Sequence, residues 1–202
     1  MAYKKREQLE KENKMLEKEI QEIKKMLENS LTPKMNMREN TIEDDGEIID
    51  IPLNKTVKVI NLYFGGLNLK TSESGGKIFR FNQFGDVRPI IYQDLLQILS
   101  LQYRFFTQGY CMILDNDVVK ANGLETYYKN ILTKKEIENI LSYNDKEISD
   151  MFSNTTKIIK ETIVDILMRK IINKEYVDHN KVRIISEIYG TDIYELAKNI
   201  KV

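Results

Sequence analysis

The first 29 residues contain no glycine or proline, and their apolar side chains recur at intervals of three, four and seven residues. Positions repeated in this way fall on one stripe of a helix and predict a coiled coil. We therefore expect residues 1–29 to form a coiled-coil helix that binds other protein subunits. Its partner-binding residues are Leu9, Leu16 and Ile23 at the d positions and Asn13, Ile20 and Leu27 at the a positions.

The pattern leaves the partner of this helix open. Isoleucine at a with leucine at d favours two strands, and the single asparagine at an a position, Asn13, fixes the register at some cost in stability. Copies of this chain are one expected partner and a different subunit is another, while a third interpretation is a solvated helix or one packed on its own chain. Flanking charges do not decide the orientation, because in a parallel pair Lys5 would attract Glu10 whereas Glu12 would repel Glu17.

Residues 30–55 are expected to form an acidic tether. Ser30 and Pro33 end the helical pattern, and residues 41–50, TIEDDGEIID, combine carboxylates with a glycine. A carboxylate run could bind a cation, but the spacing lacks the D-x-D-x-D-G order of a calcium loop. A solvated linker is the simpler interpretation.

Residues 56–122 are expected to form a small α+β unit. The stretch 56–91 is β-like, and the pair Gly65 and Gly66 interrupts it between two apolar runs. Two runs separated by a glycine pair are typical of a β-hairpin, so we expect antiparallel pairing across this turn.

From Tyr92 the apolar period becomes that of a mostly buried helix, which Gly109 ends. The apolar run 110–114 then predicts a further strand, and Asp115 is expected to form a turn or to cap a short helix.

Residues 123–202 are expected to form a helical C-terminal unit. Thr133 and Glu136 have the spacing of a capping box, and a longer helix is predicted over about residues 155–173. Two short helices follow, separated at Gly190. The predicted fold class is therefore α+β, with an N-terminal coiled-coil helix, a small antiparallel β unit with a packed helix, and a C-terminal helical bundle.

Charge and composition exclude few function classes, but they give no support to several of them. The 31 basic residues balance the 31 acidic ones, so nothing favours a nucleic acid or an anionic membrane as partner. With one cysteine, Cys111, an intrachain disulfide is impossible, which fits a reducing compartment. The N-terminus lacks an apolar signal core and no apolar run reaches 18 residues, so we expect a cytoplasmic location without a membrane span.

Candidate catalytic chemistry is sparse, and we expect no catalytic, cofactor-binding or metal-binding residue. His179 is the only histidine, and a pair with Cys111 is one conceivable nucleophilic site, although a buried structural cysteine is the simpler interpretation. One cysteine and one histidine are too few for zinc. Asp115 and Asp117 could hold magnesium, but turn chemistry explains them better.

Two patterns suggest nucleic-acid binding. Phe79 and Phe81 flank Arg80 on a predicted strand and share one face, where they could stack bases or pack against a helix. The segment from about residue 180 to residue 200 resembles a helix-turn-helix, although its second helix offers little arginine for base edges.

The order of a charged coiled coil, an acidic tether, an aromatic β unit and a helical tail resembles that of accessory virion proteins of tailed bacteriophages. The stretches VKVINLYFGGLNLK and KVRIISEIYGTDIYELAKNI carry most of this resemblance, together with abundant lysine, asparagine and isoleucine. The resemblance implies a component of the head, neck or baseplate that acts through docking surfaces, in the bacterial host and in the virion. A regulator that binds nucleic acid is the alternative, and an enzyme with an unrecognised carboxylate site is a third class.

Overall fold

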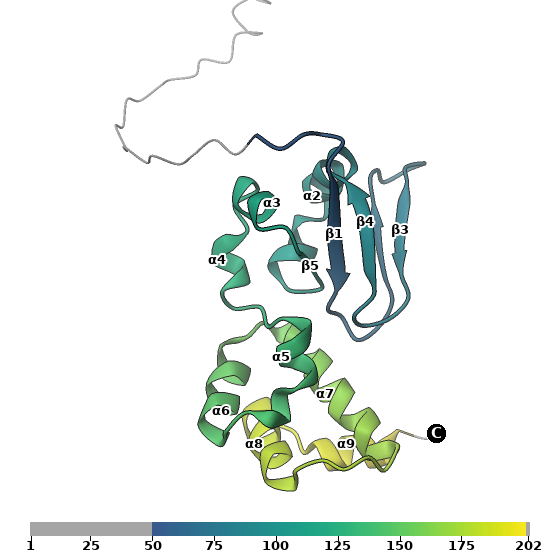
Figure 1. Ribbon diagram of the computed structural model, residues 1–202. Coiled ribbons are helices and arrows are strands. Elements are labelled where there is room, and N and C mark those ends of the chain that lie inside the picture. The colour runs from purple at the N-terminus through teal and green to yellow at the C-terminus, as the bar shows by residue number, and fades with distance from the viewer. Residues whose placement is uncertain (1–49, 201–202) are drawn as a thin grey trace, which may run out of the picture. The chain divides into compact units, whose positions relative to one another are not determined.

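The computed structural model describes residues 50–200 (Figure 1). The predicted coiled-coil helix, residues 1–29, and most of the predicted tether lie outside the described residues. The described part has an α+β fold, in which small antiparallel sheets with a packed helix precede a helical region.

The strands of the described region form two small antiparallel sheets. The first has the order β4-β1-β5 and the second pairs β2 with β3. The strands are β1 (Thr56–Asn61), β2 (Leu67–Lys70), β3 (Ile78–Phe81), β4 (Val87–Ile91) and β5 (Cys111–Ile113).

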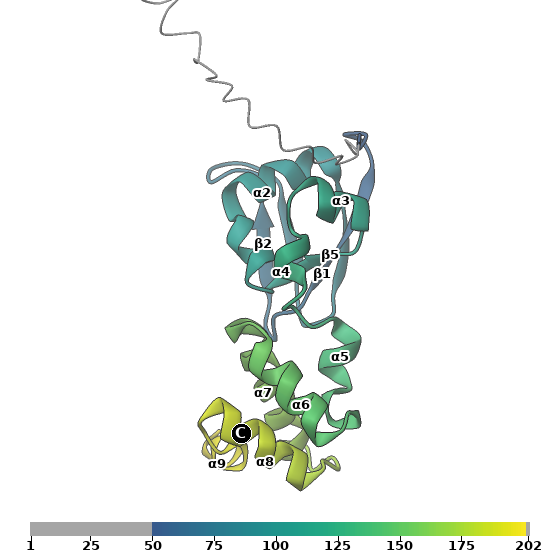
Figure 2. The same cartoon turned by 90° about the vertical axis from the view of Figure 1, so that its left-hand side faces the viewer.

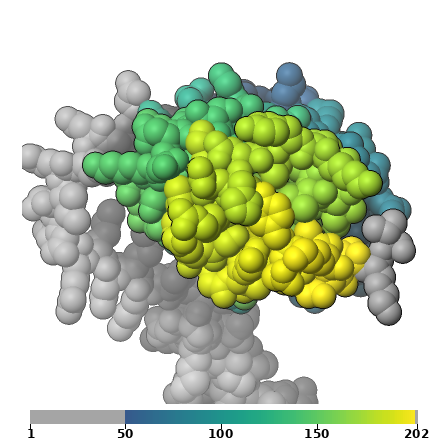
Figure 3. All heavy atoms as spheres, turned by 90° about the horizontal axis from the view of Figure 1, so that it is seen from below, coloured from purple at the N-terminus to yellow at the C-terminus, as the bar shows by residue number. Residues whose placement is uncertain are grey.

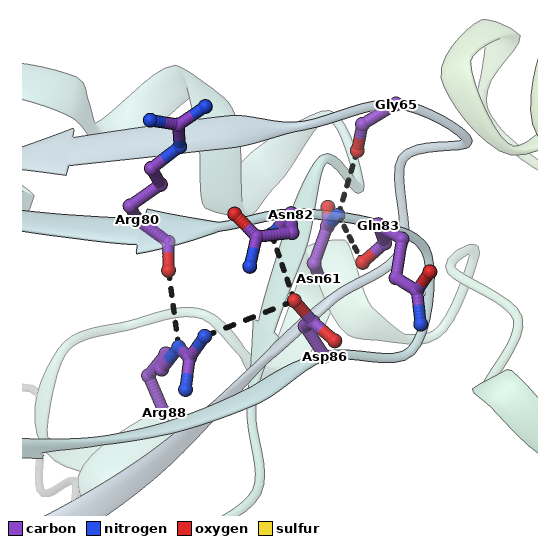
Figure 4. Close-up of polar contacts among 7 residues, drawn as sticks. All are labelled: Asn61, Gly65, Arg80, Asn82, Gln83, Asp86 and Arg88. Atoms are coloured by element: carbon purple, nitrogen blue, oxygen red, sulfur yellow. Dashed lines mark hydrogen bonds and ion pairs between the residues drawn. The ribbon is translucent and has the colours of Figure 1, made fainter.

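The hairpin expected across Gly65 and Gly66 is wrong, because β1 pairs with β4 and β5 whereas β2 pairs with β3. The cause is Asn61, which is fully buried and ends β1. Its side-chain amide donates to the carbonyl oxygens of Gly65 at 2.9 Å and Gln83 at 2.8 Å (Figure 4). The chain therefore leaves β1 and crosses to the second sheet.

Helix α2 (Tyr92–Thr107) packs on one face of both sheets, behind the strands in Figure 1 and to their left in Figure 2. Strand positions facing α2 are buried because the strands alternate in burial with a period of two. The resulting core contains Val57, Val59, Leu67, Leu69, Phe81, Ile90, Leu95, Ile98 and Leu99. At about 2 kcal/mol for each fully buried large aliphatic side chain, this core is the main stabilising contact of the β unit.

Packing of the unit begins before β1, at Ile51, which is 8% exposed. The Lys55 carbonyl accepts from the Tyr92 amide at 2.8 Å, and the Lys55 ammonium pairs with Asp115 at 2.8 Å. Residues 51–55, which the sequence assigns to the tether, are thus held against α2 and the loop after β5.

The helices after β5 are α3 (Asn116–Ala121), α4 (Glu125–Tyr128), α5 (Lys134–Glu138), a 3₁₀ turn (Ile140–Ser142), α6 (Asp145–Asn154), α7 (Lys157–Ile172), α8 (His179–Tyr189) and α9 (Ile193–Asn199). Their starts follow local cap chemistry. Capping boxes begin α5 at Thr133 and α6 at Asn144, and Asp178 and Asp192 cap α8 and α9. These short-range signals confirm the helical C-terminal region.

A second core joins this helical region to the sheet. Ile60 and Met112 lie opposite each other on the face turned away from α2, and both are buried among residues of α5 to α9. The Thr156 hydroxyl adds a 2.7 Å hydrogen bond to the carbonyl oxygen of Gln108. The helices therefore cover one end of the sheet face turned away from α2 and leave the rest of that face exposed. No helix between residues 50 and 200 combines the length and apolar character that crossing a membrane requires.

Candidate interaction surface

The predicted partner-binding residues all lie outside the described part of the chain. They are Leu9, Asn13, Leu16, Ile20, Ile23 and Leu27. The coiled-coil seam therefore stays a prediction, and the described residues have to be judged by their own surfaces.

The structure does not bring Cys111 and His179 together. Cys111 is fully buried on β5 in the core beneath α2, and burial raises the pKa of its thiol well above the usual value. His179 lies exposed at the start of α8 and stacks on Tyr194, with ring centroids 4.9 Å apart. Because a buried thiol with a raised pKa is a poor nucleophile, the described geometry gives this pair no catalytic role.

Asp115 is occupied by structural contacts. Its side chain accepts from the Val118 amide and so caps α3, and it pairs with Lys55 at 2.8 Å. The hydrogen bond from Lys55 holds the pKa of the Asp115 carboxyl below its usual value. Within residues 50–200, no three histidine, cysteine or acidic side chains gather as metal ligands would.

The aromatic side chains of β3 point to the protein interior. Phe81 is 1% exposed, and Phe79 packs partly buried against the same core as Leu95 and Leu99. Of the two interpretations of these phenylalanines, packing against a helix is confirmed and the base-stacking interpretation is wrong. Arg80, which lies between them, points to the opposite face because side chains alternate along a strand.

The opposite face of the two sheets is exposed, and its charged side chains are all cationic. We call it the outer face, defined by the exposed strand positions turned away from α2. These residues are Thr56, Lys58, Asn68, Lys70, Ile78, Arg80, Val87, Pro89 and Ile91. They include three cations and three large aliphatic side chains but no carboxylate. Among the described residues, no acidic group lies within ion-pair distance of those cations.

A polar junction joins the two sheets where β3 and β4 lie next to each other. The Arg88 guanidinium donates to the Arg80 carbonyl at 3.0 Å, which joins β4 to β3 although their backbones form no ladder. Asp86 accepts from the Asn82 amide at 2.7 Å and lies 4.0 Å from Arg88 (Figure 4). Arg80 is thus anchored through its backbone while its guanidinium points to solvent.

At the edges of the sheets, side chains from outside the strands accept hydrogen bonds from strand amides. The Lys70 amide at the edge of β2 donates to the Gln102 side chain at 2.8 Å, and the Ile113 amide at the edge of β5 donates to the Tyr128 hydroxyl at 3.0 Å. Edges that are short and capped in this way are poor templates for an added strand. The outer face, rather than an edge, is therefore the surface that the β unit offers to a partner.

Several shallow grooves involve the helical region. One, of about 460 Å³, lies between α8 and α9 and is lined by residues that include His179, Arg183 and Asp192. Another, of about 380 Å³, is lined mainly by apolar residues that include Tyr63 and Met168. Figure 3 shows the face on which α8 and α9 lie.

The segment that resembles a helix-turn-helix in sequence forms α8 and α9. Gly190 joins the helices with a φ of +81°, and α9 begins at Ile193. Its surface charge does not suit DNA, because Glu195 lies in the first turn of α9 and pairs with Lys198 at 2.6 Å. A helix that reads a major groove usually presents free arginine, lysine or amide groups to the bases.

The outer face was missed by sequence reasoning, although Lys58, Lys70 and Arg80 alternate with apolar residues on their strands. Alternation shows that each strand has a solvent face, but only the pairing of the strands shows that these faces adjoin. Comparisons of the chain with protein-family models, with curated proteins and with solved structures gave no match.

Proposed function

We propose that this is a non-catalytic structural or assembly protein that docks to other subunits, including copies of itself, through its N-terminal helix. The observation that carries the proposal is the heptad seam, with Leu9, Leu16 and Ile23 at the d positions and Ile20 and Leu27 at the a positions. A short helix with such a seam is marginal alone, so its stability must come from burying the seam against another polypeptide.

The outer face supports the same proposal from the folded unit. Ile78 is 60% exposed, Ile91 45% and Val87 40%, and three cationic side chains lie on the same face. Large aliphatic side chains exposed on one sheet face favour contact with a partner. Two distinct surfaces, one helical and one on the sheet, suit a subunit that connects others.

We further propose that the particle is the virion of a tailed bacteriophage. The support is the resemblance in element order and composition to accessory head, neck and baseplate proteins. Capsid, portal or tail genes next to the gene for this chain are the expected finding. A neighbourhood of metabolic or regulatory genes would contradict this part of the proposal while leaving the docking role intact.

Light scattering tests the docking role directly. We expect the full chain to have at least twice the monomer mass at micromolar concentration and a chain beginning at residue 31 to be smaller in oligomeric state. An equal number of subunits for the two chains would show that residues 1–30 do not hold copies together.

A nucleic-acid-binding regulator is the second candidate, because α8 and α9 meet at Gly190 as the helices of a helix-turn-helix do. Binding of the full chain to random-sequence duplex DNA at 50 mM and 200 mM salt distinguishes the two. The assembly proposal predicts negligible binding at both salt concentrations. A regulator would bind at the lower one and lose affinity by about a thousandfold or more between them if it made six or more phosphate contacts.

A further inference from the structure

The charged groups of the outer-face cations make no cap or ion pair among the described residues. The side chains of Lys58, Lys70 and Arg80 project into solvent from three different strands, and neither a cap nor an ion pair within the described residues uses them. Folded proteins usually intersperse both signs of charge on a solvated surface. On the outer face, the positive charges of the three cations are not balanced by any carboxylate on the same face.

The chemistry of the face selects the class of partner. Single-stranded nucleic acid is held by aromatic stacking combined with cations, but the aromatic side chains of β3 lie on the inner face. A membrane surface usually needs a larger basic and apolar area than the outer face provides. Carboxylates set among aliphatic residues on an extended polypeptide match both the charge and the exposed Ile78, Val87 and Ile91.

The chain itself contains a segment with this chemistry. Residues 41–50, TIEDDGEIID, hold five carboxylates among three isoleucines and no cation. We propose that the outer face binds the acidic segment 41–50 of a second copy of this chain. The inference rests on the proposed function, because the coiled coil brings a second copy close.

The dimensions allow one segment to cover the face. Ten extended residues span about 33 Å. Four neighbouring strands spaced by about 4.8 Å are roughly 15–20 Å across. A segment crossing β2, β3, β4 and β1 therefore brings carboxylates past all three cations, and it places isoleucine side chains near the exposed aliphatic ones.

Zero-length cross-linking of the full chain tests the proposal. Unlabelled and ¹⁵N-labelled chains are refolded together, and a carbodiimide then joins lysine amines to neighbouring carboxylates with loss of water. We expect links from Lys58 and Lys70 to Glu43, Asp45 or Glu47 that combine the two isotopes. The exposed Lys146, on the far helical region, should give no link to this segment.

Three outcomes overturn the proposal. Links of a single isotope would show that the segment comes from the same chain, and the absence of links to residues 43–47 would show that it does not bind. Loss of the links when oligodeoxythymidylate is added, together with protection of Lys58 and Lys70, would assign the face to nucleic acid. A dimeric mass without these links would leave the coiled coil standing and remove only this inference.

A pair of variants separates the face from general charge effects. Arg80→Gln removes one outer-face cation whose backbone, but not its side chain, has a structural contact. It should lower the yield of the mixed-isotope Lys70 link about threefold, the effect of one exposed ion pair. Lys146→Gln makes the same change elsewhere and should leave the yield unaltered, and an equal loss in both variants would contradict a specific site.

Discussion

At the scale of single residues, Asn61 decides how the two sheets are connected. Its side chain makes two donor contacts and accepts from the Tyr63 amide at 3.0 Å, all in a fully buried position. Asn61→Ala removes these three hydrogen bonds, each of which contributes about 1 kcal/mol, so we expect a loss of roughly 3 kcal/mol in the free energy of unfolding. Urea denaturation measures it, and Asn68→Ala on the exposed face should change little.

A buried hydroxyl on α7 has no hydrogen-bond partner among the described residues, so its removal should stabilise the fold. Thr162 is fully buried, and its Oγ1 has no hydrogen-bond partner among the described residues. Thr162→Val keeps the shape and removes the unpaired hydroxyl, so the free energy of unfolding should rise by about 1 kcal/mol. Thr155→Val is the control, because the Thr155 hydroxyl donates to the Asn130 carbonyl at 2.9 Å and its loss should destabilise. A gain in both variants would refute the hydrogen-bond explanation.

The pairing of Asp115 with Lys55 predicts a pH dependence. The pKa of the Asp115 carboxyl is held below its ordinary value of 3.8, so its ionised form stabilises the folded state above pH 3.8. That stabilisation is lost as the pH falls through the lower folded-state pKa. The stability difference between wild type and Asp115→Asn should therefore be constant near neutral pH and shrink below pH 3.8. A difference that stayed constant down to pH 2 would exclude this ion pair as its source.

At the scale of elements, local signals predicted the helices better than the strand pairing. Thr133 and Asn144 set helix starts through contacts three residues away, so these starts could be predicted without knowledge of the fold. The partner of β1 depends on Asn61 reaching Gln83, 22 residues along the chain, and no period in the sequence encodes that contact.

The same limit applies to the candidate surface. That Lys58 and Arg80 share one face follows from α2 covering the other face of both sheets, which alternation alone cannot show. The heptad repeat at residues 1–29 differs from this surface because it is a local pattern. It can be predicted from the sequence without knowledge of the fold.

The turn between α8 and α9 depends on one glycine. Gly190 has a φ of +81°, and an added Cβ would meet nothing within 4 Å, so substitution is resisted by backbone conformation and not by crowding. Gly190→Ala should cost about 1 kcal/mol of unfolding free energy, and Gly190→Asn should cost less because asparagine tolerates the left-handed region. Thermal denaturation of both variants measures the difference, and an equal loss would indicate a cause other than φ.

At the scale of the whole molecule, we propose two separate binding surfaces. The N-terminal seam would hold copies or neighbouring subunits together, and the outer face of the sheets would hold an acidic segment. Neither surface needs the buried Cys111 or the capping Asp115, whose contacts stabilise the folded unit. An assembly subunit of this kind would lose function through changes on exposed positions as well as through changes in its cores.

The central claim is that the seam near the N-terminus is covered by another polypeptide. The mass of two full-chain variants in solution tests this most directly: Ile20→Glu places a carboxylate in the seam, and Gln21→Glu places the same group one residue away on the solvent side. We expect monomers for Ile20→Glu and an unchanged oligomer for Gln21→Glu. Equal masses for the two variants would contradict it.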